Sequence, residues 1–81
     1  MRVLLVVSTE FERYALAARC GTDITVATVA STYGHRADVL IDLTRQRESP
    51  AEEASQELSR KALPTRVAPG GLLISRGEVV G

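Results

Sequence analysis

Eight polar side chains near the ends of three apolar segments have the chemistry to bind a small ligand. They include hydroxyl, aromatic, imidazole, guanidinium and carboxylate groups. The candidate ligand-binding residues are Ser8, Thr9, Tyr33, His35, Arg36, Asp42, Thr44 and Arg45. If the apolar segments are neighbouring parallel strands, their carboxyl ends share one edge of a sheet, where ligands of open α/β sheets bind. The sequence thus predicts a polar strand-end rim suited to a nucleotide or another phosphorylated ligand.

Asp42 raises the sharpest chemical question, because it lies where an apolar run ends. The segments "RVLLV" and "ADVLIDL" resemble response-regulator receiver domains, a resemblance that spans roughly residues 2–45. It implies that Asp42 accepts a phosphoryl group. Receiver domains also hold magnesium with an acidic pair after the first strand, where this sequence has Val7 and Ser8. Without that cation the incoming charge is not neutralised, so we interpret Asp42 as a structural strand-end residue.

The sequence gives little support for any other catalytic or metal-binding site. Cys20 is the single cysteine, which excludes an internal disulfide and a cysteine-based zinc cluster. His35 is the single histidine. Cys20 is expected to be a small buried side chain. Ser31, His35 and Asp42 could be written as a triad, but no strained nucleophile turn accompanies them. We therefore expect neither an enzyme nor a cofactor or metal.

Composition limits the class of protein further. The 81 residues are 44% hydrophobic and carry ten basic and ten acidic side chains, which predicts one domain over residues 1–81 and disfavours nucleic-acid binding. A chain this short buries about 60–65% of its unfolded surface, so a partner would help to stabilise it. The apolar run at residues 3–7 is too short for a signal peptide or a membrane span, which favours a cytoplasmic protein. Nine arginines against one lysine suggest a GC-rich genome, such as that of an actinobacterium or one of its phages.

Two helices have clear start signals. Thr9 and Glu12 form a capping box, and Phe11, Tyr14, Ala15 and Ala18 follow at helical spacing before Gly21. Ser49 and Pro50 open the second helix, which ends near Leu63-Pro64. In that helix a stripe of mainly small residues is expected to lie close on a sheet. The stripe consists of Ala51, Ala54, Leu58 and Ala62.

Strands are predicted between and after these helices. They cover residues 3–7, 23–29, 38–43, 65–68, 72–75 and 78–80, and Arg76-Gly77 forms a two-residue turn. The fold class is α/β, with a small mostly parallel or mixed sheet, the order β-α-β-β-α-β, two helices and a C-terminal β-hairpin. The short link between the second and third strands leaves two alternatives open, a taut parallel crossover or an antiparallel pairing. The continuous apolar character of residues 38–43 favours the parallel one.

The C-terminal hairpin is the predicted interaction surface. The candidate interface residues are Leu72, Leu73, Ile74, Arg76, Glu78, Val79 and Val80. They form an apolar edge with few charges, which another strand could join. The leading hypothesis is a small non-enzymatic interaction protein that docks on a protein partner or forms a homodimer, for example a phage-encoded modulator of a host protein. The alternative is a nucleotide- or phosphate-binding domain, or a minimal enzyme, that uses the strand-end rim.

Overall fold

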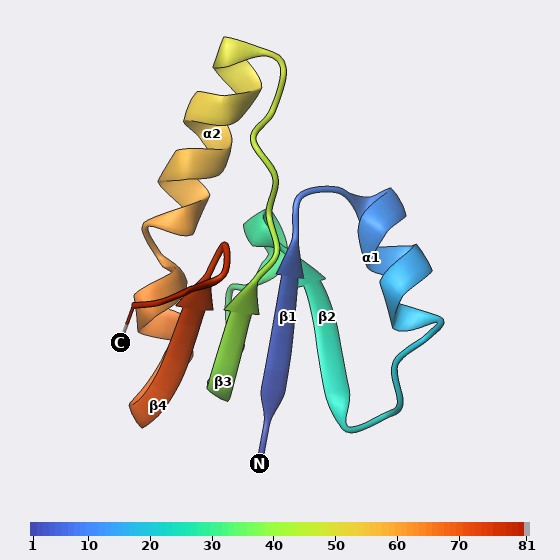
Figure 1. The fold of residues 1–81 in the computed structure, drawn as a ribbon, viewed down its shortest axis with the longest axis vertical. Helices are drawn as coiled ribbons and strands as arrows, with labels where there is room; N and C mark the ends of the chain where they lie inside the picture. The colour runs from blue at the N-terminus through green and yellow to red at the C-terminus, as the bar shows by residue number, and fades with distance from the viewer. Residues whose placement is uncertain (81) are drawn as a thin grey trace.

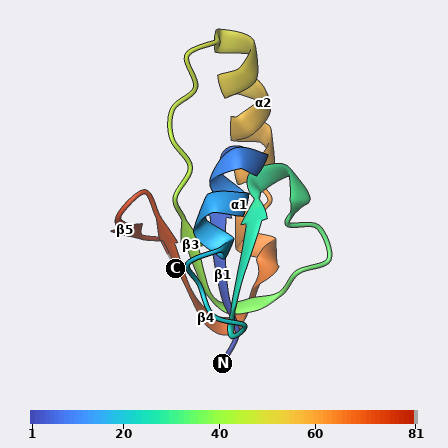
Figure 2. The ribbon, with the colours of Figure 1, turned by 90° about the vertical axis from the view of Figure 1, so that its right-hand side faces the viewer.

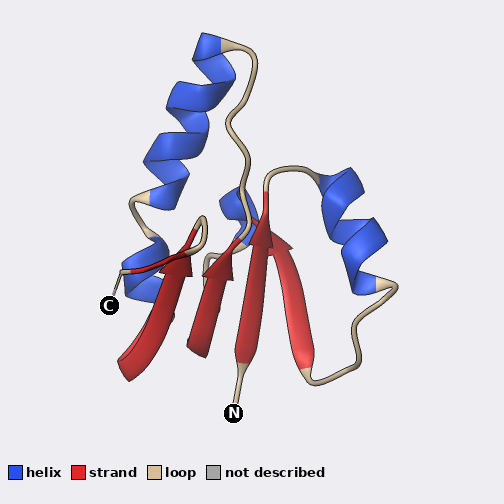
Figure 3. Ribbon diagram, in the orientation of Figure 1, coloured by secondary structure: helices blue, strands red, loops and turns tan. Residues whose placement is uncertain are grey.

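The computed structural model describes residues 1–80, which form one five-stranded sheet with two α helices and two 3-10 turns (Figures 1 and 3). In chain order the elements are β1 (Val3–Val7), α1 (Glu10–Ala17), β2 (Ile24–Thr28), η1 (Val29–Ser31), β3 (Ala37–Asp42), α2 (Pro50–Arg60), η2 (Leu63–Arg66), β4 (Val67–Ser75) and β5 (Glu78–Val79). Within these residues, no helix has both the length and the apolar character that crossing a membrane requires.

The sheet confirms the predicted α/β class. Its strand order is β2-β1-β3-β4-β5, with the first four strands parallel and β5 antiparallel to β4. The parallel alternative for the third strand is therefore right. β2 and β3 do not pair with each other, because both flank β1, and the chain joins them through η1 and a loop.

The two helices lie on opposite sides of the sheet, as the handedness of crossovers requires. Parallel β-α-β connections are right-handed, and the two crossovers that contain helices run outward from the central β1–β3 pair in opposite directions. Figure 2 shows α2 and the two 3-10 turns on one side of the sheet, which we call the back face. The opposite side, turned toward the viewer in Figure 1, is the front face. There α1 packs mainly against β2 and β1.

The core lies on the back face. Alternate residues of each strand point to one side of a sheet, and the paired registers place their side chains in rows. The buried apolar cluster comprises Leu4, Val6, Ala27, Val29, Ala37, Leu40, Leu63 and Leu73. α2 packs against η1 and extends past the carboxyl ends of the strands. The core is thus closed mainly by the 3-10 turns and the foot of α2.

The outward-facing sides of both helices differ from the sequence expectation. In α1 the predicted apolar residues Phe11, Tyr14, Ala15 and Ala18 are all exposed, whereas Leu16 and Cys20 are half-buried. In α2 the residue that turns inward and is buried is Gln56, and Ala51, Ala54 and Leu58 are exposed. The expectation that the α2 stripe lies on the sheet is therefore wrong. Most of α2 stands beyond the strands, where its inner side meets polar loop residues.

Two of the predicted strands are one strand. β4 continues through Pro69, Gly70 and Gly71, and a register shift against β3 absorbs these residues as a bulge. Gly70 has φ +79°, and a Cβ at Gly71 would lie 2.6 Å from the carbonyl oxygen of Asp38. The predicted two-residue turn is confirmed, with φ values of 50° at Arg76 and 86° at Gly77.

Candidate functional site

The structure gathers five of the eight candidate ligand-binding residues at the strand-end rim. Ser8 and Thr9 follow β1, while Asp42, Thr44 and Arg45 end or follow β3, so both loops lie at the carboxyl edge of the parallel pair. The Ser8 hydroxyl accepts a hydrogen bond from the Arg45 backbone N–H at 3.0 Å and donates to the Arg45 carbonyl oxygen at 3.5 Å. The two loops are thus joined to each other across the β1–β3 boundary.

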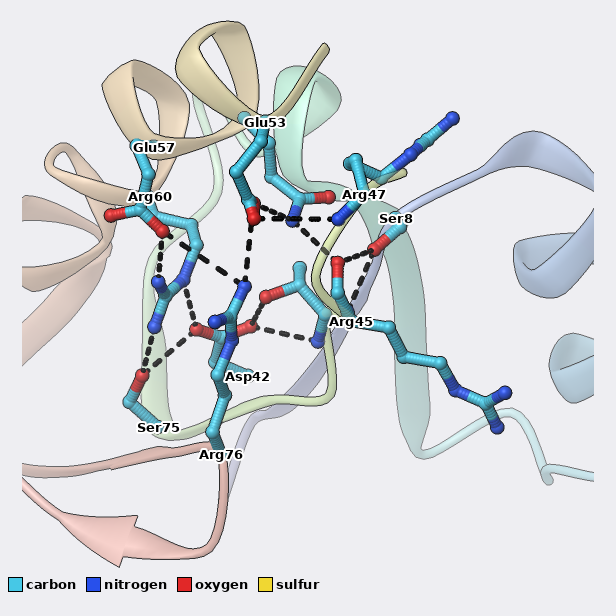
Figure 4. Close-up of polar contacts among 11 residues, drawn as sticks. Ser8, Asp42, Arg45, Arg47, Glu53, Glu57, Arg60, Ser75 and Arg76 are labelled. Atoms are coloured by element: carbon cyan, nitrogen blue, oxygen red, sulfur yellow. Dashed lines mark hydrogen bonds and ion pairs between the residues drawn. The ribbon is translucent and has the colours of Figure 1, made fainter. Parts of the chain in front are cut away.

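Asp42 is fully buried beneath α2, with 0% of its surface exposed, and both of its carboxylate oxygens bind protein donors (Figure 4). The backbone N–H and hydroxyl of Thr44 donate to Oδ1 at 2.9 and 2.6 Å. Nε of Arg60 and the hydroxyl of Ser75 each donate to Oδ2 at 2.9 Å. The carboxylate thereby ties β3 to α2 and to the end of β4.

The ionised form of Asp42 is the stable one. Burial by itself would raise the pKa of this carboxyl, but hydrogen bonds from the hydroxyl and backbone N–H of Thr44, from Arg60 and from Ser75 together hold its pKa below the usual 3.8. Burial would also lower the pKa of Arg60, yet its bonds to Asp42 and Glu57 raise it. Both oxygens of Asp42 accept hydrogen bonds from protein donors, and neither is exposed to solvent. We therefore interpret this carboxylate as a structural group and not as a phosphoryl acceptor.

Further ion pairs extend the network over the rim. Arg60 also bonds Glu57, and Nη2 of Arg76 lies 3.8 Å from Glu53 and 3.9 Å from Glu57. Sequence reasoning missed Arg60 and Ser75, because only the β3-α2-β4 crossover brings them to Asp42. The spacing of Asp42 and Thr44 was a usable signal, since short polar side chains bond the backbone two residues away.

Three predicted rim residues lie elsewhere, and their placement at the rim is wrong. His35 and Arg36 border a hollow at the amino ends of the strands, together with Arg2 and Asp23. Tyr33 is exposed, and the Arg66 guanidinium lies 5.2 Å from its ring centre, just before β4 begins. The physical reason is the parallel crossover. After η1 the chain must return along the whole sheet to start β3, which carries these three residues away from the rim.

The remaining rim surface is shallow and electrostatically mixed. A hollow of about 300 Å³ lies over Ser8, Thr9, Arg45 and Arg47, and Glu12, Glu48 and Glu52 also line it. The hydroxyl of Thr9 is already used as the N-cap, since it accepts from the Glu12 N–H at 3.2 Å and donates to Oε1 of the same residue. Three carboxylates beside two guanidiniums do not favour a multiply charged anion.

The predicted interface residues divide between the two faces. Leu73 is buried in the core, so it cannot contact a partner, because strand alternation turns it to the back. Leu72 and Ile74 are half-buried on the front face, and Ile74 pairs with Val79 of β5. Arg76 joins the ion pairs of α2, while Glu78, Val79 and Val80 are exposed. The exposed part of the predicted interface is therefore the tip of the hairpin.

One hollow of the structure was not predicted from the sequence. It has a volume of about 510 Å³ and lies between α1 and the ends of β1 and β3, and we call it the α1 groove. Its apolar walls are Val7, Phe11, Ala15, Leu16 and Leu43. Its charged lining residues are Glu12, Arg19 and Arg45. The helical spacing of Phe11 and Ala15 was visible in the sequence, but it did not show that these residues, with Phe11 83% exposed, would line a hollow.

Neither a metal site nor a known relative indicates a function for this chain. Among the described residues, no group of three His, Cys, Asp or Glu side chains is placed to hold a metal ion. Comparisons with protein-family models, with curated proteins and with solved structures found no match to this chain.

Proposed function

We propose that this chain is a small non-enzymatic interaction protein, which docks on a protein partner or associates with itself through the front face of its sheet. The observation that carries the proposal is the lack of cover on that face. Parallel sheets normally have helices on both faces, but among residues 1–80 no helix lies in front of β3 or β4 (Figure 1). A cytoplasmic location is part of the proposal and rests on the sequence.

The front face is apolar from one edge of the sheet to the other. The strand registers align Val26, Leu5, Ile41, Ile74 and Val79 in one row that crosses all five strands. A second row joins Ile24, Val3, Val39 and Leu72. All of these residues retain some exposure to solvent. Contiguous apolar surface of this kind is typical of interaction sites.

The total surface also exceeds that of a compact monomer. The chain exposes 5381 Å² for a mass of 8.7 kDa, whereas a folded monomer of this mass exposes about 4,730 Å². The surplus, roughly 650 Å², approaches the ~800 Å² that each partner buries in a protein–protein interface of standard size. This surplus supports a partner of ordinary dimensions.

Sedimentation velocity over a range of micromolar concentrations tests the proposal, together with co-purification. The double variant Leu43→Lys/Val79→Lys places two charges on the front, and Leu58→Lys on α2 is the matched control, because all three side chains are exposed. We expect self-association, or retention of a partner, that the front variant abolishes and the control preserves. A monomer that retains the same proteins in all three forms contradicts the proposal.

A second candidate function is the binding of a nucleotide or another small phosphorylated ligand at the strand-end rim. The position of the hollow over Ser8, Thr9 and Arg45 is the observation that favours it, because the strand order reverses there, the usual ligand position in such sheets. The three carboxylates that line the hollow count against it. A thermal-shift screen with nucleotides tests this function. Stabilisation that Arg45→Ala removes and Arg36→Ala, at the opposite end of the sheet, leaves unchanged would support it. No shift with any nucleotide would count against it.

A further inference from the structure

We infer that the front face beside α1 binds an amphipathic helix of a partner protein, with acidic side chains along the border of its apolar face. This inference rests on the proposed docking function and names the chemistry of the partner. It is argued from the width of the open surface, from its apolar rows and from two guanidiniums at its border.

The open surface has the dimensions of one helix. α1 covers β2 and β1, which leaves β3, β4 and β5 without a helix in front. Strands lie about 4.8 Å apart, so these three strands span roughly 10 Å, close to the ~10–12 Å diameter of a helix, at the end of the sheet where the two residues of β5 pair with Ile74 and Ser75. Six residues of β3 run for about 20 Å, the length of roughly 13 helical residues.

The chain described here cannot fill this space from within. Right-handed crossovers place only the β1–β2 connection on the front, because the β2–β3 and β3–β4 connections both run toward the β4 side of the sheet. The apolar surface continues from the strands into the α1 groove. Val7 and Leu43 line the groove, and by strand alternation they lie on the same face as Leu5 and Ile41. A helix laid there would contact the apolar side chains of both rows.

Two positively charged side chains at the α1 groove favour a partner with acidic residues. The guanidiniums of Arg19 and Arg45 border the α1 groove, and within residues 1–80 neither forms an ion pair. Figure 4 shows the Arg45 side chain pointing away from the Asp42 network. The one acid of the groove, Glu12, is held by the Thr9 hydroxyl at 3.0 Å. Carboxylates on the bound helix would therefore find two free cations beside the apolar contact.

A second copy of this chain is a poorer occupant. Its acidic helix is α2, whose Glu52 bonds Arg47 at 2.6 Å and whose Glu57 bonds Arg60. Glu53 accepts a hydrogen bond from Gln56 and lies near Arg76. These carboxylates already have partners in their own chain, so docking α2 of one copy on another would not neutralise Arg19 and Arg45.

A display library of helical peptides with randomised surface positions, selected on the intact chain, tests the inference. We expect enriched peptides to carry apolar residues at i, i+3 or i+4, and i+7, bordered by Asp or Glu. Arg19→Glu/Arg45→Glu should weaken their binding about tenfold and should select peptides bordered by Lys or Arg instead. Arg36→Glu/Lys61→Glu changes the net charge equally, away from the groove, and should leave binding unchanged.

Enriched peptides without an acidic border, or ones whose binding survives Arg19→Glu/Arg45→Glu, would overturn the inference. If such peptides still lose binding to Leu43→Lys/Val79→Lys, the front face docks partners of another chemistry and the proposed function survives. If no peptide is enriched while the chain self-associates through the front, the occupant is a second copy and the inference fails alone. If there is neither enrichment nor association, both fail.

Discussion

The two faces of this sheet are built from the same strands, yet they are covered very differently. Leu40 and Ile41 are neighbours in β3, and Leu40, on the back, is 0% exposed while Ile41, on the front, keeps part of its surface in solvent. Leu4 and Leu5 repeat this contrast in β1. An apolar strand therefore does not indicate which of its faces the chain itself will bury.

The connections explain the difference. Two of the three parallel crossovers pass behind the sheet and bring α2, η1 and η2 to the back, while the third brings the short helix α1 to the front. The back face also contains the charged centre, where Asp42 joins β3, α2 and β4. The front face has only apolar rows and the border of α1. The back face thus stabilises the fold, and the apolar side chains of the front face stay partly exposed to solvent.

The largest expected effect comes from the charged centre of the back face. Asp42→Ala leaves Arg60 without its buried partner and Thr44 and Ser75 without their acceptor, and we expect it to lower the free energy of unfolding by about 3–5 kcal/mol. Urea denaturation measures this change. Asp38→Ala is the control, because within residues 1–80 its exposed carboxylate accepts only the Arg2 backbone N–H at 2.8 Å, and it should cost no more than about 1 kcal/mol. Equal effects at both positions would contradict a structural role of Asp42.

Substitutions at the neighbouring residues Leu40 and Ile41 compare directly how much each face contributes to stability. Leu40→Ala opens a cavity in the covered core and should lower the free energy of unfolding by about 2–5 kcal/mol. Ile41→Ala should lower it by about 1 kcal/mol, because its side chain is already in part exposed. Urea denaturation at two protein concentrations checks both values. An Ile41→Ala effect as large as that of Leu40→Ala would mean that the front face is covered in solution.

Gly71 lies in the bulge of β4, where the backbone passes close to the Asp38 carbonyl oxygen of β3. Gly71→Ala places a Cβ 2.6 Å from the Asp38 carbonyl oxygen and from Cγ1 of Val67, so the bulge must shift, and we expect a loss of about 1–3 kcal/mol. Gly21→Ala is the matched control, since a Cβ there meets nothing within 4 Å. Thermal unfolding followed by circular dichroism measures both variants. A Gly71→Ala protein as stable as the control would show that the bulge does not determine the register.

A fall in pH should lower the free energy of unfolding, because Asp42 on the back face becomes protonated. Its pKa in the folded protein is lower than the ordinary 3.8, so the stabilisation is fully present above about pH 4 and is lost as the pH falls below 3.8 toward the folded value. Denaturation midpoints of the wild type should therefore fall more steeply in this range than those of Asp42→Asn. Parallel pH profiles for the two proteins would refute the assignment of a lowered pKa to Asp42.

The smallest effect is expected on the outer side of α2. Leu58 is 69% exposed, so Leu58→Ala should change the free energy of unfolding by no more than about 0.5 kcal/mol. The sequence stripe of α2 predicts instead the 2–5 kcal/mol loss that is typical of a buried leucine. A urea denaturation curve distinguishes the two. A large loss would indicate that this side of α2 is covered.

The sequence alone determined the local structure, because each local signal acts over a few residues. The N-caps Thr9 and Ser49, the position of Pro50 and the turn at Arg76-Gly77 all occur where their chemistry predicts. The strand runs also predicted the parallel β1–β3 pair, and with it the meeting of Ser8 and Arg45 at one rim. Four strand segments were right, and only the bulge at Pro69-Gly70-Gly71 hid the continuity of β4.

Only the tertiary structure decided which faces are covered and which polar residues meet. Helical spacing identifies a stripe of residues but not what the stripe packs against, so the stripe of α2 was predicted to lie on the sheet although Ala51, Ala54 and Leu58 face solvent. The return of the chain from η1 to β3 separated Tyr33, His35 and Arg36 from the rim. The same topology brought Arg60 and Ser75 to Asp42 from distant positions in the chain. These outcomes depend on the direction of crossovers between strands, which short-range residue patterns do not encode.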